Sequence, residues 1–123
     1  MYVGKKLRVE QRVDYKDTAS SYGSGLLEVF STPAMIALME KSAHLLAKSI
    51  LPENIDTVGT EVDIKHTRAT PIGALVTAEA ELISFEERKL VFKLFAFDEN
   101  GEIGYGKHIR YTIDPVKFMN KLN

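Results

Sequence analysis

The stretch FSTPAMIALMEKSAHLLA, residues Phe30–Ala47, decides the fold that this sequence predicts. Its apolar residues recur every three or four positions, which is the pattern of a buried α-helix. Pro33 suits the first helical turn, where its missing N–H costs no hydrogen bond, and Ser31 or Thr32 can cap that turn. The pattern predicts a helix from Pro33 to about Ile50, covered on all faces over its first seven residues, PAMIALM.

The segments around this helix alternate apolar and polar residues, with the period of two that β-strands show. One strand is predicted over Leu7–Tyr15. Four more are predicted within residues 57–69, 74–85, 89–97 and 103–113, joined mostly by hairpin turns. Residues 16–25, KDTASSYGSG, are small and polar and predict a mobile loop rather than an element of its own. This loop could act as a lid.

One helix that needs covering and about five antiparallel strands predict an α+β fold in a single domain over residues 1–123. A curved sheet wrapped around the helix is the most economical arrangement. Such a sheet leaves two edges and an apolar outer face, to which the segment VFKLFAF contributes. Since association of two copies can cover both, we predict a homodimer, with a dimer of dimers left open.

Composition excludes several classes of partner and chemistry. With 16 basic and 17 acidic residues and a net charge of -1, the chain has no charge run that predicts a nucleic acid or an anionic membrane as partner. The absence of cysteine excludes disulfides and thiolate catalysis and favours a cytoplasmic location. The three histidines, His44, His66 and His108, do not have metal-ligand spacing, so no metal is predicted.

Glu40 and His44 stand one helical turn apart in the middle of the apolar helix. They are either the solvated side of a helix that emerges into water or partly buried working groups. Burial would raise the pKa of Glu40 toward the range in which a carboxylate acts as a base near neutral pH. Spacing alone leaves both interpretations open.

Three other residues have both a structural and a functional interpretation. Thr32 is a helix cap or a site residue. His66 shares a predicted strand face with Val58, Thr60, Val62 and Ile64, and lies just before a Pro-Gly turn, a usual place for site residues. Arg110 shares a face of the last strand with His108, and it either binds a phosphate or is a surface charge.

Three segments of the sequence resemble the hot-dog-fold acyl-CoA thioesterases, most closely the fluoroacetyl-CoA thioesterase-like subgroup. They are FSTPAMIALMEKSA, GTEVDIKHTRATPIG and IGYGKHIRYTID, of which HTRATPIG is the most specific. The resemblance spans about residues 7–118. It implies a hot-dog fold, in which a curved antiparallel sheet of about five strands wraps one long central helix.

The resemblance also implies roles for five residues. Thr32 at the helix start, Glu40 eight residues later and His66 in the HTRATP segment occupy the places of the catalytic residues. Gly59 and Arg110 occupy the places of residues that line the site and bind substrate. The implied reaction hydrolyses an acyl-CoA to a free acid and coenzyme A, with no cofactor besides the coenzyme A of the substrate.

These residue types suit the implied chemistry. Glu40 can activate water or attack the thioester carbonyl, and Thr32 is a competing nucleophile if His66 takes its proton. The N–H of Gly59 or the first amides of the helix can stabilise the oxyanion. Eight helical residues nevertheless separate Thr32 from Glu40 by roughly 12 Å. The two therefore act on different parts of the substrate or meet across a dimer interface.

The segment before the helix departs from the subgroup. Fluoroacetyl-specific members carry an aromatic-rich lid there, whereas SSYGSGLLEVF is shorter and has Gly23 and Leu26 near those places. This departure predicts a short or medium acyl group. Two rival interpretations are a non-catalytic acyl-CoA binding or sensing module and a purely structural dimer module. A hydratase of the same fold is disfavoured, since its Asp and His pair, five residues apart, is not found at the corresponding places.

Overall fold

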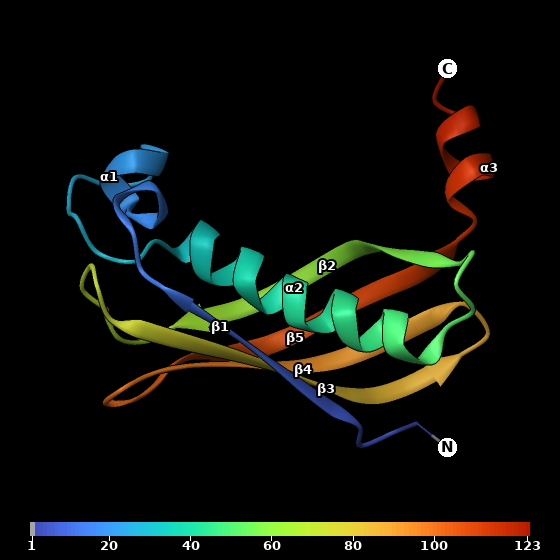
Figure 1. Cartoon of the computed structure of the whole chain (residues 1–123), viewed down its shortest axis with the longest axis horizontal. Helices are drawn as coiled ribbons and strands as arrows, with labels where there is room; N and C mark the ends of the chain where they lie inside the picture. Colours follow the sequence, from blue (N-terminus) through green and yellow to red (C-terminus); the bar gives the residue numbers. More distant parts are fainter. Residues whose placement is uncertain (1) are drawn as a thin grey trace.

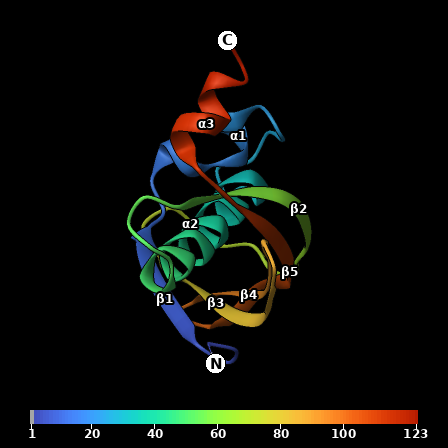
Figure 2. The ribbon, with the colours of Figure 1, turned by 90° about the vertical axis from the view of Figure 1, so that its right-hand side faces the viewer.

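The structure, a computed structural model, describes residues 2–123 and consists of one antiparallel sheet curled around a central helix (Figure 1). The sheet has the strand order β1-β3-β4-β5-β2, which makes β1 and β2 its edges. The strands are β1 (Lys6–Arg12), β2 (Asp56–His66), β3 (Leu75–Glu86), β4 (Lys89–Asp98) and β5 (Gly101–Ile113). The helix α2 (Thr32–Ile50) lies in the concave face, as the end-on view shows (Figure 2). The predicted α+β fold is confirmed.

The first turn of α2 resolves which residue caps the helix. The Ser31 side chain accepts a hydrogen bond from the N–H of Ala34 at 3.1 Å, and Pro33 occupies the first turn. Ser31 is therefore the cap, and the helix begins at Thr32, one residue earlier than predicted. Because Ser31 satisfies the free amide, the hydroxyl of Thr32 is available for another partner.

The sheet covers α2 on one side. Met35, Leu38 and Met39 are buried against the strands, whereas Pro33 and Ala37 are exposed. The prediction that the first seven residues of the helix are covered on all faces is therefore wrong for a single chain. A single curved sheet reaches only part of the circumference of a helix, so the opposite side of this apolar segment faces outward.

The segment predicted as a mobile loop forms two short helical elements. They are the 3₁₀ helix η1 (Tyr15–Asp17) and the helix α1 (Ala19–Tyr22), which lie beside the N-terminal end of α2 (Figure 1). The Asp14 side chain caps η1 by accepting from the Tyr15 N–H, and Thr18 Oγ1 caps α1 by accepting from the N–H of Ser21 at 3.1 Å. The first strand, predicted over Leu7–Tyr15, therefore ends at Arg12. The side-chain caps order the polar segment that follows it.

A β-bulge changes the face of half of β2. The pairing with β5 shifts register between Gly59 and Glu61. Gly59 pairs with Arg110, and Val62 pairs with His108, so both lie on the inner face of the sheet. Val58 and Thr60 therefore do not share the face of Val62, Ile64 and His66, and that prediction is wrong.

The C-terminal helix α3 (Pro115–Asn120) follows β5 and projects from the body of the molecule (Figure 1). The sequence pattern did not predict this helix. Asp114 caps it by accepting from the N–H groups of Val116 and Lys117. Among residues 2–123, no helix is long and apolar enough to cross a membrane.

Candidate active site

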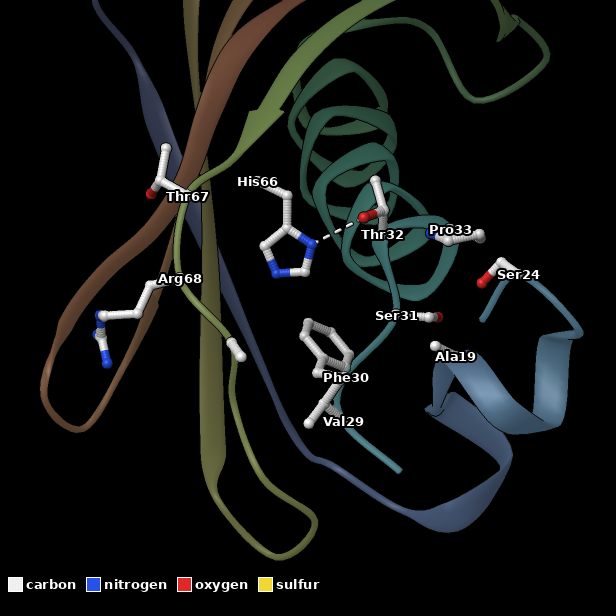
Figure 3. Close-up of a pocket in the computed structure, with 11 residues that line it drawn as sticks. Ala19, Ser24, Val29, Phe30, Ser31, Thr32, Pro33, His66, Thr67 and Arg68 are labelled. Atoms are coloured by element: carbon white, nitrogen blue, oxygen red, sulfur yellow. Dashed lines mark hydrogen bonds between the residues drawn. The ribbon is translucent and has the colours of Figure 1, made fainter. Parts of the chain in front are cut away.

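The start of α2 and the end of β2 bring a hydroxyl and an imidazole into contact. Thr32 Oγ1 and His66 Nδ1 lie 2.8 Å apart, within hydrogen-bonding distance (Figure 3). When the imidazole carries its proton on Nε2, the Thr32 hydroxyl donates to Nδ1. A hydroxyl nucleophile and its base adopt this arrangement in covalent catalysis.

This pair lines an open cavity of about 420 Å³, a volume within the range of small-molecule sites. The wall opposite His66 comes from α1 and the chain that leads into α2, and it is mostly apolar or small. It includes Ala19, Ser24, Val29, Phe30 and Pro33 (Figure 3). The cavity therefore offers an apolar wall next to a candidate nucleophile.

Burial controls the charge of His66. The desolvation that follows from burial lowers the pKa of His66 below its usual value, and the nearby backbone of Arg68 opposes this only in part. The Nε2 atom is buried and has no hydrogen-bond partner within the described chain. His66 is consequently neutral near pH 7, which is the form that can accept a proton.

The turn that follows His66 is anchored to the end of β4. Arg68 Nη2 donates to Asp98 Oδ1 at 2.6 Å, and Thr70 Oγ1 donates to Asp98 Oδ2 at 2.9 Å. Burial raises the pKa of Asp98, but the bonds from Arg68, the Asn100 N–H and Thr70 outweigh it and lower the pKa overall. This anchor could not be predicted from the sequence, because about 30 residues separate its partners and no local spacing indicates it.

A second cluster surrounds Arg110, a residue of β5 that faces a later turn of α2. Arg110 is 7% exposed, and its guanidinium donates to Thr57 Oγ1 at 2.8 Å and to the Thr57 carbonyl at 3.1 Å. Burial lowers the pKa of Arg110, whereas the carboxylates of Glu40 and Asp56 raise it. The interpretation of Arg110 as a surface charge is wrong.

Glu40 faces this guanidinium from α2. Its Oε2 lies 3.9 Å from Arg110 Nη1, and its side chain is 39% exposed. Glu40 is thus neither part of a fully solvated face nor deeply buried. It is a half-exposed carboxylate beside a buried cation.

Gly59 allows the approach of Glu40 to the sheet. A Cβ atom at this position would lie 2.9 Å from Glu40 Oε2, 2.9 Å from His108 Cε1 and 3.3 Å from Arg110 Nη1. Any side chain would displace these groups, so glycine is required by the close packing. The structure therefore places Gly59 and Arg110, both predicted to line the site, around Glu40.

The candidate residues thus form two clusters on one chain. Thr32 bonds His66 at the start of α2, and Glu40 faces Gly59 and Arg110 eight residues further along. The rise of the helix separates the two clusters by roughly 12 Å, so they do not meet within one chain.

Comparison with known proteins identifies the class first. A hot-dog-like protein from Thermanaerovibrio acidaminovorans superposes with a TM-score of 0.88 at 24% identity, covering 98% of this chain and 89% of that one. This similarity shows the hot-dog fold. A solved structure of a threonine-to-serine mutant of the fluoroacetyl-CoA thioesterase FlK, in complex with acetyl-CoA, superposes with a TM-score of 0.93 at 34% identity. It covers 99% of this chain and 96% of that one.

Sequence comparison identifies the family. Residues 13–115 match the family of fluoroacetyl-CoA-specific thioesterases. A fluoroacetyl-CoA thioesterase from Streptantibioticus cattleyicolor is 40% identical over 95 residues, which are 77% of this chain and 68% of that protein. The chain belongs to this family and is a thioester hydrolase that acts on acyl-CoA.

Proposed function

We propose that this enzyme hydrolyses short- and medium-chain acyl-CoA esters through an acyl-threonine intermediate. The observation that carries the proposal is the 2.8 Å contact between Thr32 and the neutral His66 in a cavity whose opposite wall is mostly apolar or small. The rival interpretation as a non-catalytic acyl-CoA sensor needs no such nucleophile and base pair.

The proposed reaction has two balanced steps. The Thr32 oxygen bonds to the thioester carbon while its proton passes to His66, the C–S bond breaks, and coenzyme A leaves with that proton. A water molecule then bonds to the same carbon while His66 takes its proton, and the acid leaves as Thr32 regains its hydrogen. These steps use protein side chains and water, and coenzyme A takes part as a portion of the substrate.

A carboxylate beside His66 would orient the imidazole and stabilise its protonated form in both steps. Glu40 is the candidate, but it lies in the other cluster of its own chain. We therefore propose a homodimer in which the partner's Glu40 serves the Thr32–His66 pair. The cytoplasmic location stays a prediction from the absence of cysteine.

The free edge of β2 supports this dimer. Five successive residues of that edge, residues 59–63, are exposed, and an exposed edge strand is a template for pairing with a second copy. In a twofold antiparallel pair, the numbers of facing residues have a constant sum. A pair centred on Val62 lays the stretch from Val62 to His66 beside the partner's residues that precede Val62, and it brings His66 near the partner's Gly59, the glycine that packs against Glu40.

A single cysteine tests this pairing, because the natural chain has none. In a pair centred on Val62, two Val62→Cys thiols face each other, and mild oxidation should convert most of the protein to a covalent dimer on a non-reducing gel. Glu10→Cys, on the opposite edge strand β1, is the matched control and should stay monomeric on the gel. A Val62→Cys protein that also stays monomeric would contradict the pairing.

The substrate proposal is tested with a panel of acyl-CoAs from acetyl to decanoyl, with benzoyl- and fluoroacetyl-CoA, by release of free thiol. We expect hydrolysis of short and medium chains. Since Gly23 and Leu26 present no aromatic ring, we expect fluoroacetyl- and acetyl-CoA to have kcat/KM values within about tenfold of each other. Binding of CoA esters with no thiol release across the panel would establish the sensor instead.

A further inference from the structure

His108 is a buried histidine to which neither the proposed reaction nor the family resemblance assigns a role. It lies on the inner face of β5, is 0% exposed, and packs beside the ring of Phe92 with the ring centres 6.2 Å apart. Both of its nitrogens have polar neighbours. Nδ1 lies 2.8 Å from the carbonyl oxygen of Glu61, and Nε2 lies 3.0 Å from Arg110 Nη1.

These two contacts fix the tautomer of His108. A carbonyl oxygen can only accept, so Nδ1 carries the hydrogen and donates it to Glu61. A guanidinium can only donate, so Nε2 is unprotonated and accepts from Arg110. Burial and the charge of Arg110 lower the pKa of His108, against the opposite effects of the Glu61 carbonyl and Glu40. The imidazole is therefore a neutral acceptor.

The β-bulge in β2 provides the carbonyl that holds this tautomer. The register shift between Gly59 and Glu61 interrupts the ladder between β2 and β5 beside His108, which pairs with Val62. Bulges commonly re-aim groups next to active sites. Here the bulge places the Glu61 carbonyl against His108 Nδ1.

His108 completes the set of bonds that hold Arg110 in place. Nε and Nη2 of Arg110 bond Thr57, and Nη1 bonds His108, so each nitrogen of the guanidinium has a partner. The same Nη1 stays 3.9 Å from Glu40 Oε2, beyond hydrogen-bonding distance. The guanidinium is thus held back from the carboxylate that it faces.

We propose that His108 is a positioning residue that restrains Arg110 and thereby keeps the Glu40 carboxylate free to serve the reaction. A carboxylate hydrogen-bonded directly to Arg110 would offer less stabilisation to a protonated His66. The inference rests on the proposed function, because it concerns the availability of Glu40. The ionisable groups that face His108 are Glu40 from α2 and Arg110 from β5. The charge of Asp56 on β2 raises the pKa of Arg110.

The kinetic test compares His108→Leu, which removes the acceptor, with His108→Gln, whose side-chain oxygen can still accept from Arg110. For His108→Leu we expect kcat to fall roughly tenfold to a hundredfold with little change in KM, because Arg110 closes on Glu40. The acidic limb of the kcat/KM profile should move to lower pH, because a Glu40 carboxylate bonded to Arg110 raises the pKa of His66 less than a free one does. His108→Gln should recover most of the activity.

His44→Leu is the matched control. His44 lies one turn after Glu40 but bonds Asp56 at 2.7 Å rather than Arg110, so its loss should move neither kcat nor the pH profile. A reduced kcat in His108→Leu with an unmoved acidic limb, or no recovery in His108→Gln, would indicate a merely structural role and overturn the proposal.

A second measurement does not depend on activity or on a variant that folds. Nitrogen-proton correlation spectra of the wild-type imidazoles at pH 7 should show His108 protonated on Nδ1 and unprotonated on Nε2. A proton on Nε2 would overturn the proposal, because Nε2 could then not accept from Arg110. If no acyl-CoA is hydrolysed but this tautomer is found, the proposed function fails and the restraint on Arg110 stands.

Discussion

Replacing His66 with alanine is expected to lower kcat for acyl-CoA hydrolysis by roughly a hundredfold to ten-thousandfold. The variant leaves the Thr32 hydroxyl without the base that lies 2.8 Å away. His66 is at the end of β2 and is only half-buried, so we expect the fold to remain. Thiol release with the best acyl-CoA of the panel measures the effect. Full activity in His66→Ala would remove His66 from the mechanism.

The pH profile of the wild type tests the same role of His66 through the direction in which its acidic limb is displaced. The reaction needs neutral His66, and burial lowers the pKa of His66 below its usual value. Activity should therefore persist to a lower pH than an ordinary imidazole would allow and fall as the pH drops through the lowered pKa. In His66→Ala this limb should disappear. His44→Ala, which removes a half-exposed imidazole bonded to Asp56, should retain both the activity and the limb.

The parts of the fold that the sequence predicted have local causes. Ser31, Pro33 and the apolar repeat define the start of α2 within a few residues, and the period of two defines the strands. Local chemistry also leaves ambiguities that packing resolves. Ser31 and Thr32 are both good caps, and the structure shows that Ser31 caps the helix, which frees Thr32 for His66.

The parts that could not be predicted depend on contacts distant in sequence. The bulge at Gly59 arises from the way β2 pairs with β5. It interrupts the alternation of faces along β2, so residues before and after it no longer follow one period of two. Alternation alone therefore placed Val58 on the wrong face. The short helices before α2 were missed because side-chain caps, rather than apolar periodicity, stabilise them.

The candidate site also has a part that local sequence predicts and a part that depends on contacts distant in sequence. Residue types and spacing left Thr32, Glu40 and His66 each with two interpretations, and the family resemblance grouped them. The structure adds that Thr32 contacts His66 and that Glu40 faces Arg110. The role of His108 could not be read from its spacing to Arg110, because it depends on the Glu61 carbonyl that the bulge presents.

Mixed dimers of two inactive variants are expected to regain activity. In the proposed dimer, each site takes Thr32 and His66 from one chain and Glu40 from the other. A dimer of one His66→Ala chain and one Glu40→Gln chain therefore has one site with both changes and one intact site. Random pairing makes half of the dimers mixed, so activity should reach about a quarter of the wild-type value.

The decisive measurement is thiol release after the two variants are unfolded together and refolded, with differently tagged chains to confirm that mixed dimers form. Each variant treated alone gives the baseline. Thr32→Ala with His66→Ala is the matched control, because both changes fall in the same half of the site and no mixed dimer is intact. Recovery toward a quarter for His66→Ala with Glu40→Gln, and none for the control, is the predicted result. Mixed dimers that stay at the baseline would contradict a site shared between two chains.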